Sequence, residues 1–114
     1  MTETFSFGVE PITCHAWSPD GKSIALSLNS REIQILTRSS DREQWTLVHT
    51  LREHTDRVLS LDWGKNTNRI LSAGADRNAF VWTFVDGKGR LLLMSNTHRL
   101  YNITISSYIL QRFR

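Results

Sequence analysis

A repeated segment constrains the fold of this chain more than any other feature. The sequence AWSPDG at residues 16–21 begins a stretch that returns 46 residues later, without gaps, as DWGKNT at residues 62–67. Apolar positions coincide at this spacing: Trp17 falls on Trp63, and Ile24 falls on Ile70. Matches at one fixed spacing indicate repeated supersecondary units rather than a single irregular domain.

The length of the repeat predicts what kind of unit it is. A period of ~40–45 residues that closes on a tryptophan, as the second copy does at Trp82, is typical of a WD-type β-propeller blade. A closed propeller has ~4–8 blades, and a chain of 114 residues has room for about two. We therefore predict an all-β fold: about two four-stranded antiparallel blades of an incomplete propeller, followed by an irregular tail.

The strands of these blades are predicted from short alternating or β-branched segments between polar turns. Residues 91–94, with the sequence LLLM, are the only candidate for the outer strand of the second blade, after a hairpin turn at residues 86–89. Residues 103–105 and 108–110 fit a strand, a helix or a disordered segment. The earlier strands are predicted at residues 24–28, 32–36, 44–49, 57–63, 69–73 and 79–82.

The distribution of charge divides the chain. The net charge is +3, but residues 1–87 contribute −2 and residues 88–114 contribute +5, with no acidic residue in the second range. We predict a WD-repeat region at residues 1–87, with a first blade at about 12–51 and a second at about 58–95, and a divergent basic tail at residues 88–114. A basic tail can attract nucleic acid or acidic lipid.

Four side chains of the second copy stand at spacings that allow a chain of hydrogen bonds. His54 precedes the inner strand, Ser72 lies within a strand, and Asp76 lies in a turn six residues before Trp82. We predict contacts from Asp76 to His54, from His54 to the Ser72 hydroxyl, and from Ser72 to the indole N–H. Each contact satisfies a polar group that burial would otherwise leave unpaired, at a cost of about 1–3 kcal/mol.

The same residue types suggest a serine hydrolase, which the sequence disfavours. A catalytic serine needs an exposed hydroxyl beside an oxyanion hole, whereas Ser72 is predicted within a strand and no Gly-x-Ser-x-Gly segment occurs. We therefore predict a structural network and no enzyme activity. The first copy is expected to rely on apolar packing alone, because its four matching positions are Gly8, Leu26, Ser30 and Leu36.

No cofactor or metal site is predicted. Cys14 and His15 are adjacent, and neighbouring side chains of a strand point to opposite faces. Trp17, Trp45 and Trp63 are expected to pack in the core or between blades rather than to form a ligand cage. The single cysteine excludes an internal disulfide, and no run of about 18 apolar residues predicts a membrane span.

Two segments go beyond a generic WD blade. EPITCHAW at residues 10–17 and ADRNAFVW at residues 75–82, with LREH at 51–54 and LDW at 61–63, closely resemble the WD-repeat subunit 1 of the actin-related protein 2/3 complex. The resemblance covers about residues 5–86. It implies the first two blades of a family whose propeller has seven blades, within the usual range of ~4–8.

The resemblance also implies a function. It points to a non-catalytic scaffold, in the cytoplasm and actin cytoskeleton, of the assembly that nucleates branched actin filaments. The implied partners are the other subunits of that complex and actin filaments; no nucleic acid, membrane span or small-molecule substrate is expected. Because the similarity ends near residue 86, close to the change in charge, we expect a truncated form.

Two alternatives remain at this point. One is a WD scaffold of another complex, such as a ubiquitin-ligase adaptor. The other is a nucleic-acid or membrane binder that uses basic and aromatic residues of the tail, among them Arg99, Tyr101, Tyr108, Arg112 and Phe113. Whichever function holds, the face of the second blade that a third blade would cover has no neighbour, so we expect apolar side chains such as Leu71 to be exposed there.

Overall fold

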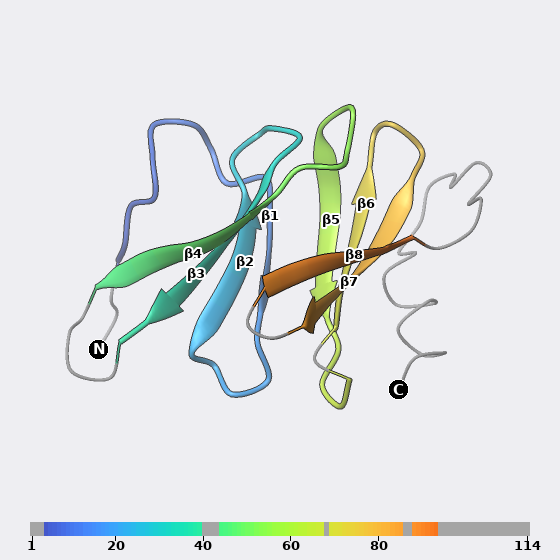
Figure 1. Cartoon of the computed structure of the whole chain (residues 1–114). Helices are drawn as coiled ribbons and strands as arrows, with labels where there is room; N and C mark the ends of the chain where they lie inside the picture. Colours follow the sequence, from blue (N-terminus) through green and yellow to red (C-terminus); the bar gives the residue numbers. More distant parts are fainter. Residues whose placement is uncertain (1–3, 40–43, 68, 86–87, 94–114) are drawn as a thin grey trace.

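The computed structural model describes residues 4–39, 44–67, 69–85 and 88–93, in which every regular element is a β-strand (Figure 1). Over these ranges no helix is long and apolar enough to cross a membrane. In chain order the strands are β1 (Cys14–Trp17), β2 (Ser23–Ser27), β3 (Ile33–Arg38), β4 (Trp45–Leu51), β5 (Val58–Trp63), β6 (Arg69–Gly74), β7 (Ala79–Val85) and β8 (Lys88–Leu93).

The strands form two four-stranded antiparallel sheets, in the orders β1-β2-β3-β4 and β5-β6-β7-β8. Their pairing preserves the 46-residue offset of the sequence: Trp17 lies opposite Ile24 in the first sheet, and Trp63 lies opposite Ile70 in the second. The predicted fold class, two four-stranded blades of a WD-type propeller, is therefore confirmed. Blade 1 here denotes β1–β4, and blade 2 denotes β5–β8.

The outer strand of blade 2 begins earlier than predicted. β8 covers Lys88–Leu93 and pairs with β7 along its length, from Val85 opposite Lys88 to Phe80 opposite Leu93. The first residues of the predicted basic tail thus belong to a blade, because a hairpin can continue the ladder of β7 whatever the charge of its side chains. Residues 94–114, with Arg99, Tyr101 and the other tail residues named above, lie outside the described ranges.

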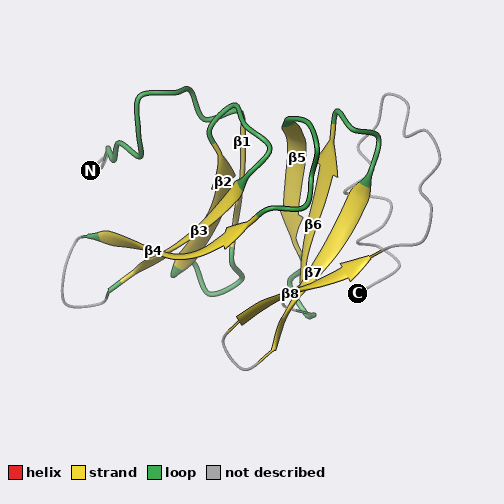
Figure 2. Ribbon diagram, turned by 45° about the horizontal axis from the view of Figure 1, so that its top comes forward, coloured by secondary structure: helices red, strands yellow, loops and turns green. Residues whose placement is uncertain are grey.

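The two blades pack face to face around their inner strands. β1 and β5 lie side by side, and the two sheets diverge from there toward their outer strands (Figure 2). The backbone N–H of Val58 also donates to the carbonyl of Ser30, at 2.9 Å, which joins the start of β5 to the β2–β3 turn. The core between the blades combines Ala25, Ile33, Ile35 and Leu51 with Val58, Leu61, Trp63, Ile70, Phe80 and Trp82.

The N-terminal segment covers part of the other face of blade 1. The rings of Phe5 and Phe7 approach the ring of Trp45 edge-on, with centroids 5.9 and 6.1 Å away. Trp17 lies beside Trp45 at 5.6 Å but remains 50% exposed, whereas its repeat partner Trp63 is 7% exposed between the blades. Apart from Trp17, this face holds a small cluster: Ile24, Leu26 and Leu36, flanked by Phe7, Leu28 and Trp45.

The expectation that Leu71 is exposed is wrong. Leu71 has no exposed surface, and Val81 beside it on β7 is 1% exposed. Leu71 lies on the central strand β6, opposite Asp62 of β5 and Val81 of β7. Large exposed apolar side chains instead occur at Trp17, Leu47 and Val48 of blade 1 and at Leu59 of blade 2, among others.

Candidate functional site

Blade 2 brings together the four residues of the predicted network from four separate parts of the chain. His54 lies in the connection between β4 and β5, and Ser72 lies in the middle of β6. Asp76 occupies the turn between β6 and β7, and Trp82 follows on β7. The network therefore joins the loop that enters the blade to its two central strands.

The distances give a continuous chain of hydrogen bonds. Nδ1 of His54 lies 3.1 and 3.0 Å from the two carboxylate oxygens of Asp76, and its Nε2 lies 2.7 Å from Oγ of Ser72. The indole Nε1–H of Trp82 donates to the same Oγ at 2.9 Å. Since Asp76 accepts at Nδ1, the neutral ring carries its proton there, and Nε2 accepts from the Ser72 hydroxyl.

The turn that holds Asp76 is itself fixed by that carboxylate. Its two oxygens accept from the backbone N–H groups of Thr55, at 2.9 Å, and Asn78, at 3.1 Å. Arg77 follows with a φ of 70°, a left-handed conformation that is uncommon for a residue with a side chain. The Arg77 N–H donates to the carbonyl of Gly74 at 3.1 Å, which closes the turn.

Gly74 is a member of this site that the sequence reasoning missed. A Cβ atom at Gly74 would lie 2.6 Å from Oδ1 of Asp76 and 2.6 Å from Nδ1 of His54. Neither atom belongs to a free side-chain end, because both are held in the network. The position requires glycine for clearance, and a glycine that closes a strand next to a turn gives only a general signal in a sequence.

Burial sets the protonation of the pair. Desolvation lowers the pKa of His54 below its usual 6.5 and outweighs the opposite effect of Asp76, so the ring is neutral near pH 7. For Asp76, desolvation is the largest influence and raises the pKa. The hydrogen bonds from Thr55, Asn78 and His54 together outweigh it and hold that pKa below 3.8.

The arrangement suits a structural role and not nucleophilic chemistry. Ser72 has no exposed surface, and its hydroxyl both donates to His54 and accepts from Trp82. A nucleophilic serine must instead present its oxygen to a substrate beside an oxyanion hole. Among the described residues, no three His, Cys, Asp or Glu side chains gather in a way that would hold a metal ion.

Blade 1 has different residues at the positions that form the network in blade 2. At the positions of Ser72 and Trp82 it has Leu26 and Leu36, which pack in the apolar cluster of its outer face. The expectation of apolar packing alone is incomplete, because the buried Ser27 hydroxyl lies 3.0 Å from the Ser30 carbonyl and 2.8 Å from that of Glu32. Blade 1 thus also contains a buried hydroxyl, and its bonds stay within the β2–β3 turn.

Comparison with known proteins agrees with this geometry. Residues 45–83 match the family described as WD domain, G-beta repeat, and they include the whole network of blade 2. The matched segment begins at the first residue of β4 and ends within β7. The sequence repeat is therefore displaced by one strand from the blade, so that each repeat links two neighbouring sheets.

Several curated proteins are similar to the chain over 65–77% of its length. Actin-related protein 2/3 complex subunit 1A-A of Xenopus laevis is 46% identical over 81 residues, which are 71% of this chain and 21% of that protein. Subunit 1A of the same complex in Arabidopsis thaliana is 40% identical over 74 residues, 65% of this chain and 19% of that protein. The 66 kDa stress protein of Physarum polycephalum is 32% identical over 91 residues, 77% of this chain and 14% of that protein.

The resemblance inferred from residues 10–17 and 75–82 is thereby confirmed for the WD-repeat region. The chain spans about a fifth of the length of the first of these relatives, which fits two blades out of a longer propeller.

Proposed function

We propose that this chain is a non-catalytic WD-repeat scaffold of the actin-related protein 2/3 complex, acting in actin nucleation and branched filament assembly. The single observation that supports it best is the 46% identity over 81 residues to a subunit 1 of that complex. On this proposal its partners are the other subunits and actin filaments, and it resides in the cytoplasm with the actin cytoskeleton. It has no substrate and no cofactor.

The structure supports a scaffold because its polar network is directed inward. The network fixes a loop to a sheet, and its one hydroxyl is fully buried. A WD scaffold acts through the surfaces that its loops and strand edges present, and these need a rigid framework. Blade 2 supplies such a framework, since the hydrogen-bond chain holds the entry loop and the β6–β7 turn against the sheet.

Reconstitution tests the proposal. The complex is assembled without subunit 1, this chain is added, and both co-purification and the rate of branched actin assembly are measured. We expect weak but saturable co-purification and little branching, because two blades offer only part of the surface and lose ordering entropy on binding. The full-length Xenopus relative is the positive control.

A pair of variants makes the association specific. Trp63→Ala removes a side chain from the core between the blades, whereas Trp17→Ala removes one that is half exposed. Co-purification should be lost with the first and largely kept with the second. The scaffold proposal fails if the chain does not associate at all. Branching at the normal rate would instead show that two blades are sufficient.

A further inference from the structure

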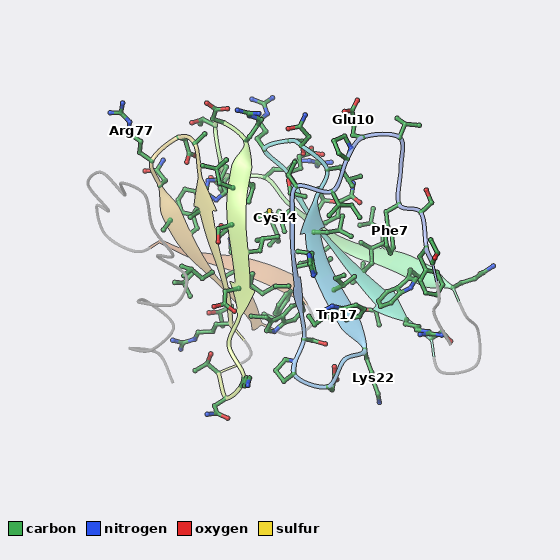
Figure 3. The ribbon with its side chains drawn as sticks, turned by 180° about the vertical axis from the view of Figure 1, so that it is seen from behind. Phe7, Glu10, Cys14, Trp17, Lys22 and Arg77 are labelled. Carbon is green, nitrogen blue, oxygen red and sulfur yellow. The ribbon has the colours of Figure 1, made fainter. Side chains whose placement is uncertain are left out.

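A groove of about 430 Å³ lies between the two blades, at the opposite end of the sheets from the His54 network. It opens where the β1–β2 loop of blade 1 meets the β5–β6 loop of blade 2. In Figure 3 this is the end marked by Lys22, with Glu10 and Arg77 at the other end. Its volume is within the ~300–1,000 Å³ of typical ligand sites.

Apolar side chains of the core line part of the groove. Ile35 and Trp63 are two of these side chains and belong to the core between the blades. The ring of Phe84 stacks against that of Trp63, with centroids 5.9 Å apart and planes 23° apart. The ring of His49 also approaches that of Phe84, with centroids 5.4 Å apart and planes tilted by 41°. Ring contacts of this kind hold the side chains in place before binding, so an apolar group that binds beside them costs little ordering.

A β-bulge directs a further apolar side chain to this groove. Between β3 and β4, Ile35 lies opposite His49 and Leu36 lies opposite Leu47, which leaves Val48 without a partner. Val48 is 46% exposed and lines the groove. The matching pair of strands in blade 2, β7 and β8, has a regular register. Bulges of this kind redirect side chains and are frequent beside functional sites.

The two lips of the groove have opposite charges. On blade 1, Asp20 accepts from the Ser18 hydroxyl at 2.6 Å and from the Lys22 N–H at 2.9 Å, both at Oδ1. These bonds orient the carboxylate at the lip of the groove. On blade 2, Lys65 is exposed and lines the opposite side. A ligand with both charges would therefore be oriented across the groove.

We propose that this groove binds an extended peptide segment of a partner protein. A bulky apolar side chain of the peptide occupies the pocket over Phe84 and Val48. A basic residue on one side of it pairs with Asp20, and an acidic residue on the other side pairs with Lys65. The inference concerns a surface that the His54 network does not form, and it does not depend on the proposed role in actin assembly.

The test uses the full chain and three seven-residue fluorescent peptides, with affinity measured by fluorescence anisotropy. Two peptides place phenylalanine between lysine and glutamate in the two possible orders, and the third has serine in place of phenylalanine. We expect one charge order to bind with a Kd below about 1 mM. The serine peptide should bind at least about tenfold more weakly, because it lacks the anchor.

Matched variants locate the binding. Val48→Asp should weaken the better peptide at least about tenfold, whereas Leu47→Asp, at a neighbouring residue that is 51% exposed but does not line the groove, should not. Lys65→Glu should weaken it, and Arg31→Glu, at an exposed residue near His54 at the other end of the sheets, should have little effect. The proposal is overturned if neither charge order binds, if the serine peptide binds equally well, or if the Val48 and Leu47 variants behave alike.

Discussion

Blades 1 and 2 have the same strand order, and their second and third strands pair in the same register, yet they hold their entry segments by different chemistry. In blade 2, His54 fills the space over Gly74. At the matching positions of blade 1, Gly8 lies over Leu28, and a Cβ at Gly8 would be 3.1 Å from a Leu28 methyl group. The large and small members of the pair are thus exchanged between the blades.

The exchange shows that the blade needs a filled space at this point rather than a particular interaction. An apolar pair fills it in blade 1 without any demand on polar geometry. The polar pair of blade 2 must satisfy every buried donor and acceptor, and it then connects the loop, the turn and two strands. The second solution is more specific, and it is more sensitive to substitution and to pH.

The largest expected difference concerns the two tryptophans of the repeat. Trp63→Ala should lower the free energy of unfolding by about 3–5 kcal/mol, since it leaves a cavity in the core between the blades. Trp17→Ala should cost about 1 kcal/mol, because half of that side chain is already exposed. Denaturant melts followed by far-UV circular dichroism measure both. Similar losses would mean that the outer face of blade 1, which holds Trp17, contributes as much to stability as the core between the blades.

Gly74→Ala should be the next most damaging change, at about 3 kcal/mol. The added methyl group overlaps His54 and Asp76 and disrupts their hydrogen bonds. The double variant with His54→Gly removes one of the two overlaps, since the contact with Asp76 remains. Its loss should therefore be smaller than the sum of the two single losses. Additive losses in the double variant would show that the strain at Gly74 does not come from the contact with His54.

Removing a partner of the network should cost somewhat less. His54→Ala or Asp76→Ala is expected to lower stability by about 1–3 kcal/mol, since each leaves buried polar groups unpaired. Ser30→Ala, at the position in blade 1 that matches Asp76, should stay within about ±0.5 kcal/mol. The comparison is made by denaturant melts, and equal losses at both sites would contradict a network confined to blade 2.

The smallest of the expected effects is a loss of stability of blade 2 in acid. The pKa of His54 is lower in the folded state than its ordinary 6.5, so the unfolded chain binds more protons. Stability is therefore complete above about pH 6.5 and falls as the pH drops toward the folded-state pKa. A second loss follows below 3.8, because the pKa of Asp76 is also lowered.

Amide hydrogen exchange can measure the effect of acid on each blade individually. Protection factors of β6 and β7 amides should fall between pH 7 and pH 5, while those of β2 and β3 change little. His54→Gln, which cannot take up a proton in this range, should remove the difference. An equal fall in both blades would place the sensitive group elsewhere.

Much of the fold and of the network was predictable from the sequence, because both are repeated or local patterns. Alternation located most strands, the 46-residue offset predicted the shared register, and the spacing of Asp76 and Trp82 identified the network residues. These features depend on residues that are neighbours along a strand or equivalent in two copies. Hydrophobic periodicity and hydrogen-bonding capacity follow directly from the types of the residues and their order.

The remaining features depended on atoms that only the tertiary structure brings together. The clearance at Gly74 is set by the side chains of His54 and Asp76, which lie on other segments. The burial of Leu71 could not be predicted from the residues of its own strand. The bulge at Val48 and the groove that it lines arise from the pairing of β3 with β4 and from the packing of one blade on the other. A sequence pattern predicts which face of a strand is apolar. Packing density and close contact decide what lies against that face, because they depend on distances between residues far apart in the chain.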